Sequence, residues 1–261
     1  MTVAHRLAPF ALLLAAPAVG TAQSVSPPIV EHRGNAKSSF VVGNESLFPL
    51  TVQLSVKGFE VDSVGVLRDV PLDTTRVRVK LSTLSFRLQP RQRYTVFYEA
   101  SSDSLPAWFN IWSAVSGART SAGLNLRIEL PHVVYLNQRE KLAEADVQLR
   151  GATWEVARKQ VVVDVQNGSP RIGRAQLVEV TTPSLPKAEA PAFPLFPGRR
   201  RLVAVPWPHP VAPARVEVRF DGFRVATSSI AIDSTAAPDP VPIDVEPDVP
   251  PAVAADTSAS R

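Results

Sequence analysis

The stretch Leu124-Asn125-Leu126-Arg127-Ile128-Glu129-Leu130 shows the pattern that dominates this chain, an apolar residue at every second position. Side chains of a β-strand point alternately to opposite faces, so this spacing predicts a strand with one face toward a core and one toward water. The same alternation recurs around Val52, Val77 and Val163. Turn residues separate these segments at short intervals, which favours a sandwich or barrel of short strands.

The composition supports an all-β protein and excludes several kinds of chemistry. Of the 261 residues, 25 are proline, which breaks the interior of helices. The absence of cysteine excludes disulfide frameworks, thiol catalysis and cysteine-ligated metal sites. The four histidines have no metal-ligand spacing, and no nucleophile elbow, phosphate loop or dinucleotide motif occurs. We therefore expect no enzyme activity, no catalytic residue, no metal and no cofactor.

The two ends of the chain differ from the strand-rich body. Residues 1–22 have a basic start, an apolar run and small residues at the close, which is typical of a cleaved export signal; an uncleaved membrane helix is the alternative. Residues 233–261 are rich in Ala, Pro and Asp and are predicted to form a disordered acidic tail. No later apolar run reaches about 18 residues, so we predict an exported protein without a membrane anchor.

The body between these ends is predicted to form two domains. Strand patterns fill residues 24–136 and resume over 146–232, with the polar residues 137–145 as a linker. The proline-rich residues 183–197 are expected to connect strands of the second domain. Residues 23–232 hold 26 Lys and Arg against 18 Asp and Glu. The basic run 199–201 has no interleaved aromatic residues, so nucleic acid is not expected as a partner.

Some aromatic and histidine residues invite a functional interpretation, but the structural one is favoured. Trp108, Phe109 and Trp112 lie within five residues and are expected to belong to the core. His132 follows a proline at a predicted strand end, and His209 lies between two prolines. Both histidines are therefore predicted to lie in loops or on the surface.

The order of several strand and turn motifs resembles that of one family. The motifs, in chain order, are Val25-Ser26-Pro27, Phe40 to Ser46, Leu84 to Gln92, Phe109-Asn110-Ile111, Leu124 to Leu130, Val163 to Gly168 and Phe196 to Arg200. This order resembles the periplasmic pilus-assembly chaperones of the chaperone–usher pathway. The resemblance implies two immunoglobulin-like β-sandwich domains in tandem and a periplasmic location.

The same resemblance implies a mode of action. In that family the last strand of the first domain lends its alternating apolar side chains to a pilus subunit, and a basic pair in the cleft anchors the subunit's carboxylate. By resemblance the subunit-binding strand comprises Leu124, Leu126, Ile128 and Leu130, and the candidate carboxylate anchor comprises Arg33 and Arg127. From the alternation alone, packing of the four apolar residues in their own domain's core is favoured over an exposed ridge.

Two functions of different classes follow. The first is a chaperone that binds pilus or surface-fibre subunits by β-strand donation and works with an outer-membrane usher. The alternative is a tandem immunoglobulin-like structural or adhesion module of the cell envelope without chaperone activity. A hydrolase on a β-sandwich has no supporting triad in the sequence.

Overall fold

The computed structural model describes residues 23–119 and 125–235. Within these residues the regular secondary structure is β-strand except for one short 3₁₀ helix, η1 (Glu144–Asp146), which precedes the second half. The predicted all-β fold is confirmed. The predicted export signal (1–22) and most of the predicted tail lie outside the described residues. No helix in 23–119 or 125–235 has the length and apolarity needed to cross a membrane.

The first sandwich is built from two sheets. One has the order β1–β3–β8–β6, formed by β1 (Gln23–Ser26), β3 (Ala36–Asn44), β8 (Arg93–Ser102) and β6 (Val77–Leu81). The other has the order β2–β10–β9–β4–β5, with β7 also paired to β4; its strands are β2 (Ile29–Arg33), β10 (Asn125–Asn137), β9 (Ala107–Arg119), β4 (Leu50–Val61), β5 (Leu67–Val70) and β7 (Ser85–Leu88). The alternating apolar residues of both sheets meet in one core that includes Phe40, Val52 and Phe109.

The second sandwich also has two sheets. The first of them, β16–β12–β11–β19, comprises β16 (Arg200–Pro206), β12 (Gln160–Asn167), β11 (Val147–Glu155) and β19 (Ala231–Asp233). The other, β14–β13–β17–β18 with β15 also on β13, comprises β14 (Ala188–Ala190), β13 (Gly173–Thr181), β17 (Arg215–Phe220), β18 (Arg224–Thr227) and β15 (Phe193–Leu195). The proline-rich segment expected to be a plain connection contains β14 and β15. Both strands pair with β13, on the side opposite β17. Pro194 of β15 is tolerated because β15 has no second partner among the described strands.

The two domains use the same buried asparagine corner. Asn44 donates from Nδ2 to the carbonyl of Phe48 at 2.8 Å, and its Oδ1 accepts from the Ser46 backbone N–H at 3.0 Å. Asn167 repeats this arrangement with the Arg171 carbonyl at 2.6 Å and the Ser169 N–H at 2.9 Å. Each asparagine side chain supplies hydrogen-bond partners for backbone groups that the turn would otherwise leave unsatisfied. The repeated corner indicates two copies of one sandwich plan.

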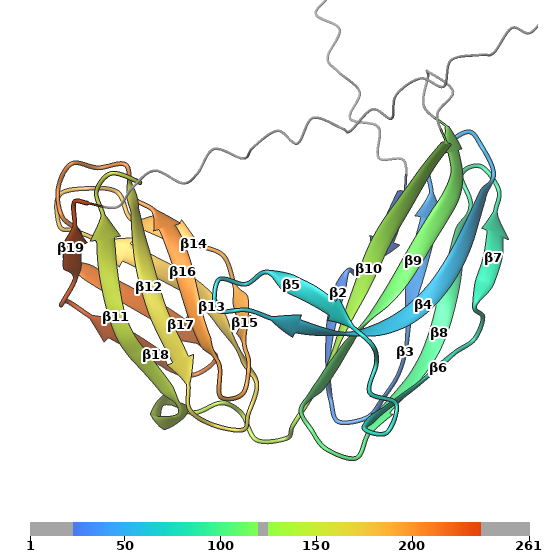
Figure 1. The fold of residues 1–261 in the computed structure, drawn as a ribbon, viewed down its shortest axis with the longest axis horizontal. Helices are drawn as coiled ribbons and strands as arrows, with labels where there is room; N and C mark the ends of the chain where they lie inside the picture. The colour runs from blue at the N-terminus through green and yellow to red at the C-terminus, as the bar shows by residue number, and fades with distance from the viewer. Residues whose placement is uncertain (1–22, 120–124, 236–261) are drawn as a thin grey trace, which may run out of the picture.

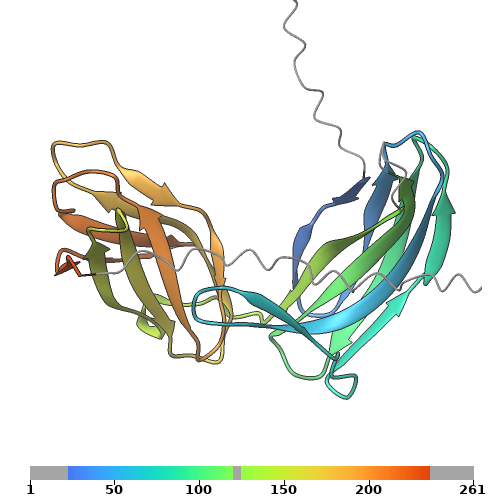
Figure 2. The same ribbon diagram turned by 45° about the horizontal axis from the view of Figure 1, so that its top comes forward.

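Figure 1 shows the two sandwiches side by side at an angle, with the hairpin of β4 and β5 reaching from the first toward the second. Figure 2 shows the same reach from another side. At the hairpin tip, the backbone N–H of Leu202 donates to the carbonyl of Ser63 at 2.7 Å. Gly65 has a positive φ of 93°, and the Arg201 guanidinium occupies the space that a Cβ would need. The tip therefore seats on β16 only with glycine at that position.

An apolar cluster completes the junction between the domains. Phe59 and Tyr135 of the first domain pack against Ile172 and Phe196 of the second. The Trp108 indole N–H donates to the Phe59 carbonyl at 2.9 Å, and its ring contacts Phe196 edge-on at 4.8 Å between centroids. Buried aromatic contact of this kind holds the two sandwiches at one relative angle.

Candidate subunit-binding edge and interdomain pocket

The strand β10 has two neighbours along one half and one neighbour along the other. It pairs with β9 from Asn125 to Leu136, but with β2 only from Val133 to Asn137. Within the described chain, no strand pairs with the other side of its first half. The outward backbone N–H and C=O groups of that half are therefore available to an added strand.

The apolar residues of this first half become more buried toward the middle of the strand. Leu126 is 42% exposed, Ile128 is half-buried, and Leu130 packs against the core of the first domain. Leu124 lies outside the described residues. The alternative that these residues simply form core fits Leu130 but not Leu126. The structure thus leaves an apolar ridge, Leu126 and Ile128, at the open side of the sandwich.

A bulge in β9 lies opposite the start of this ridge. Leu126 pairs with Ala118 and Arg127 pairs with Ser116, so Gly117 is the extra residue. Gly117 has a φ of 95°, and a Cβ there would lie 3.2 Å from the carbonyl oxygen of Pro49. Bulges increase the local twist of a sheet and occur at edges where a strand is directed away. The bulge therefore sets the direction in which the ridge leaves the sandwich.

The structure does not bring the two predicted anchor arginines together. Arg33 is the β2 partner of Asn137, whereas Arg127 lies ten residues earlier on β10. At 3.3 Å per residue this separation is about 33 Å along the strand. Arg127 is exposed and its guanidinium contacts the Glu129 carboxylate at 3.1 Å. Strand register, which the sequence does not reveal, is the reason that they cannot share one anion.

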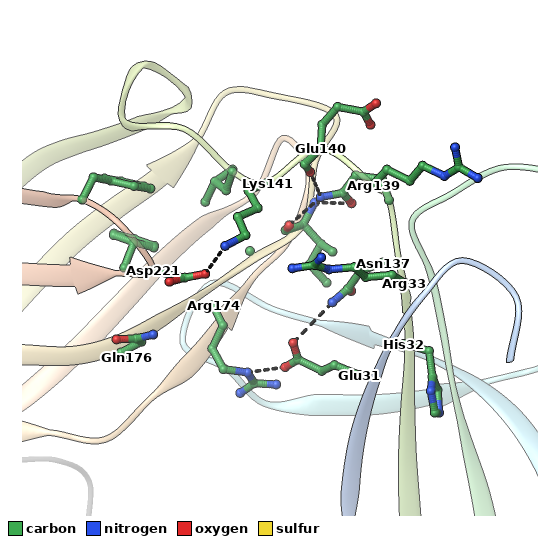
Figure 3. A pocket seen from close by; sticks show the side chains of 16 residues that line it. Glu31, His32, Arg33, Asn137, Arg139, Glu140, Lys141, Arg174, Gln176 and Asp221 are labelled. Carbon is green, nitrogen blue, oxygen red and sulfur yellow. Dashed lines mark hydrogen bonds and ion pairs between the residues drawn. The ribbon is translucent and has the colours of Figure 1, made fainter. Parts of the chain in front are cut away.

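Arg33 instead lines a pocket between the domains, with a volume of about 360 Å³. Its walls come from β2, residues 137–142, the start of β13 and the turn after β17. Figure 3 shows the Arg33 side chain pointing into this pocket and Arg139 pointing away from it. In the part of the chain that is described, no carboxylate forms an ion pair with Arg33. It is therefore the cation available to a bound anion.

Four other charged residues that line the pocket are already paired with one another. Lys141 contacts Asp221 at 2.7 Å, and Arg174 donates to Glu31, which also accepts from Asn137 at 3.3 Å. The Lys141 ammonium lowers the pKa of Asp221 below its ordinary value by hydrogen bonding and charge, and Arg33 adds to this effect. Asp221 therefore stays ionised at neutral pH and holds Lys141 at the pocket wall.

Lys141 and Arg174 are pocket residues that the sequence pattern did not identify. Lys141 lies in the segment predicted to be a linker, and Arg174 lies in the second domain. Their place beside β2 depends on how the two sandwiches meet. Gln138 holds the linker against the second domain, because its side-chain amide donates to the Ile172 carbonyl at 3.0 Å and accepts from the Ile172 N–H at 3.2 Å. No motif in the sequence signals this arrangement.

The prediction that His132 lies in a loop or on the surface is wrong. His132 is 0% exposed within β10, and its Nδ1 donates to the Pro27 carbonyl at 2.7 Å. Its Nε2 faces the Tyr98 hydroxyl at 3.5 Å, and His32 contacts the same hydroxyl at 3.0 Å. Burial lowers the pKa of both histidines. A neutral His132 therefore ties β10 to the residues between β1 and β2.

The three clustered aromatic residues separate in the structure. Phe109 belongs to the core of the first domain, as predicted. Trp108 packs in the junction between the domains. Trp112 lies on the face turned away from the core, where its indole N–H donates to Asp69 at 3.3 Å. His209 lies in a loop, as predicted, and the described residues contain no group of side chains suited to a metal ion.

Comparison with known proteins gives a fold but no sequence relative. No family model matches the chain, and no curated protein matches it. Among solved structures, the SafB chaperone, in complex with the SafA pilin of Salmonella enterica, is 13% identical with a TM-score of 0.50; the match covers 79% of this chain and 96% of that one.

Two further solved structures give similar coverage. The class 5 fimbriae chaperone CfaA is 7% identical with a TM-score of 0.49, and the match covers 78% of this chain and 97% of that one. The CupB2 chaperone of Pseudomonas aeruginosa is 17% identical with a TM-score of 0.43, over 78% of this chain and 98% of that one. The predicted resemblance is confirmed at the level of the fold: this chain has the two-domain immunoglobulin-like fold of the chaperone–usher fimbrial chaperones.

Proposed function

We propose that this protein is an exported, periplasmic chaperone-like protein that binds and caps pilus or surface-fibre subunits by β-strand donation. The observation that carries the proposal is the free outer edge of the first half of β10, which pairs with β9 only and carries the exposed Leu126 and the half-buried Ile128. An outer-membrane usher would receive the capped subunit. The proposal contains no chemical reaction.

The physical need for such a strand is simple. A sandwich that lacks one strand exposes core residues and an unpaired edge, and both promote aggregation. The free half of β10 can supply backbone hydrogen bonds to that edge, while Leu126 and Ile128 fill the gap in the core. An exposed apolar ridge of this kind costs the chaperone solubility unless it has a partner.

The proposed carboxylate anchor is Arg33 without Arg127. A planar guanidinium can bind a carboxylate through two parallel hydrogen bonds, and Arg33 points into the pocket with no ion pair among the described residues. The strand β2 fills the edge of β10 from Val133 onward. A subunit chain end therefore leaves the free edge at Ile29 and follows β2 for about 13 Å to reach Arg33.

The test is recovery of a partner from the periplasm. A tagged full-length chain, produced in its own host, is expected to co-purify with a β-rich fibre subunit that mass spectrometry identifies. Leu126→Asp and Ile128→Asp place a charge on the ridge and should abolish the co-purification. Glu129→Gln, on the opposite face of the same strand, is the matched control and should retain it.

Two results would overturn the proposal. One is recovery of the chain alone under conditions in which the host assembles surface fibres. The other is undiminished recovery of a subunit with Leu126→Asp, since the ridge would then not form the contact. Either result favours the alternative of an envelope structural or adhesion module.

A further inference from the structure

A second unpaired edge lies at the opposite side of the first domain, on β6. This strand pairs with β8 only, as far as the described residues show. Val77 is buried, and Val79 and Leu81 are half-buried and pack against the core. On the other face of the strand, Arg78 and Lys80 are exposed. β6 is therefore an edge strand with an apolar inner face and a cationic outer face.

The cations of β6 restrict which strand could pair with it. Arg78 forms a two-pronged ion pair with Asp103, at 2.6 and 2.9 Å, on the solvent side. In the part of the chain that is described, Lys80 has no ion pair. Basic side chains on an edge strand repel most added strands. A strand with acidic residues on its outer face would instead form opposite-charge pairs across the two strands.

The chain itself contains a segment with that pattern. In Asp239-Pro-Val-Pro-Ile-Asp-Val-Glu246, β-branched residues recur at Val241, Ile243 and Val245. The residues that alternate with them are Pro240, Pro242, Asp244 and Glu246. Proline is accepted on an edge strand when its nitrogen faces solvent, and alternate positions of a strand face the same side. The segment could thus offer apolar side chains inward and two carboxylates outward.

We propose that residues 239–246 of one copy of this chain add as a strand to β6 of a second copy. Val241, Ile243 and Val245 would extend the apolar row of Val77, Val79 and Leu81, and Asp244 and Glu246 would face Arg78 and Lys80. The contact is separate from β10 and goes beyond the proposed function. The two parts that would meet also have opposite net charges, because residues 23–232 are basic and residues 233–261 carry a net charge of −5.

The contact forms between two copies because the last described strand of the second domain, β19, lies too far from β6 of the same chain. β19 pairs with Thr153 to Glu155, the end of β11 that is remote from the linker. Both views place β19 on the side of the second domain turned away from β6 (Figures 1 and 2). Five residues, 236–240, separate the described chain from Val241 and span at most about 18 Å. The nine-residue β11 alone spans about 30 Å, so the segment falls short of its own β6.

Such a contact joins two different surfaces and is head-to-tail. Head-to-tail contacts form rings when they close and open chains when they do not. Fixing the backbone of eight residues in one strand costs conformational entropy, so the association is weak and depends on concentration. Its charge pairs are exposed, so it is also sensitive to salt.

The test is sedimentation analysis of the full-length chain over a range of concentrations. At about 0.1 M NaCl the mean mass should rise with concentration, and at about 1 M it should fall back to the monomer, because the Debye length shortens from about 10 Å to about 3 Å. Asp244→Lys/Glu246→Lys and Arg78→Glu/Lys80→Glu should each weaken the association at least about tenfold. Asp256→Lys and Arg87→Glu each reverse one charge elsewhere in the chain and should have little effect.

A charge-swap mixture guards against variants that simply misfold. The two double variants, each monomeric alone, should associate when mixed, because lysines on one segment then face glutamates on the other chain's β6. The proposal is overturned if the natural chain stays monomeric throughout, or if the mixture fails to associate. It is equally overturned if Leu126→Asp, and not the β6 variant, removes the association, because the contact would then lie on β10.

Discussion

The two halves of β10 have the same alternating sequence pattern but different surroundings. From Val133 to Asn137 the strand lies between β9 and β2, with Val134 and Leu136 fully buried and Tyr135 packed against the second domain. From Asn125 to His132 it has β9 on one side and no paired strand on the other within the described chain. One half is a structural support, and the other is an open edge.

The difference teaches that the neighbour of a strand decides its role. β2 begins at Ile29, directly after the residues that cross from one sheet to the other, and this start sets where the free edge of β10 ends. His132 lies at that boundary and holds the Pro27 carbonyl. The lengths of the supported and free halves are thus set by where the N-terminal strand changes sheets.

The largest effect should come from truncating the supported half. Leu136→Ala removes a fully buried side chain from the core, so we expect a loss of about 2–5 kcal/mol in the free energy of unfolding. Leu126→Ala, at the exposed end of the same strand, should cost less than about 1 kcal/mol. Urea denaturation of both variants measures the difference. Equal losses would mean that the two halves are equally packed.

A smaller effect should separate the two arginines in subunit binding. Arg33→Gln removes the proposed carboxylate anchor, so the affinity for a co-purified subunit should fall about 10- to 100-fold, the range for a lost charged hydrogen bond. Arg127→Gln removes a cation that is already paired with Glu129 on the surface and should change the affinity little. Titration calorimetry with each variant measures both values. An Arg127→Gln loss as large as that of Arg33→Gln would contradict the assignment.

The smallest effect concerns the boundary residue and pH. Burial lowers the pKa of His132 and His32 in the folded chain, so the unfolded chain binds more protons near and below pH 6.5. The free energy of unfolding should therefore fall as the pH is lowered from about 7.5 to about 5. The carboxylates of lowered pKa, such as Asp146, add to this loss only at lower pH.

His132→Asn should reduce this dependence between pH 7.5 and 5 without abolishing it, because His32 remains. His209→Asn, at a loop position away from the contact of His132 with Tyr98, is the control. Urea denaturation at several pH values gives both slopes. If His132→Asn leaves the slope as steep as in the natural chain, the buried histidine is not the group that titrates.

The sequence predicted the strands well and their neighbours poorly. Alternation at Leu126, Ile128 and Leu130 predicts a strand, but a half-buried strand inside a sheet and one at its edge have the same period. Only the pairing of β2 with the second half of β10 distinguishes them. The prediction for His132 is wrong for a related reason, because the proline before it indicates a strand end. In the structure β10 continues through Pro131, since no described strand pairs with the side of β10 that faces away from β9 at this residue.

The interdomain pocket could not be predicted from the sequence. Arg33, Lys141 and Arg174 come from three separate parts of the chain, and they meet only because of the angle between the domains. That angle depends on contacts such as Phe59 with Phe196 and Leu202 with Ser63. Neither spacing nor composition encodes contacts between residues more than a hundred positions apart.

The most direct test of the central claim is hydrogen exchange along β10, for the chain alone and in complex with a co-purified fibre subunit. Added-strand pairing should slow the exchange of those alternate amides in residues 125–130 that point away from β9 at least about tenfold, because they gain partners. Residues 133–137 lie between β9 and β2 and should be protected in both states. Unchanged exchange in residues 125–130, with new protection elsewhere in the chain, would contradict the assignment of this edge as the subunit-binding strand.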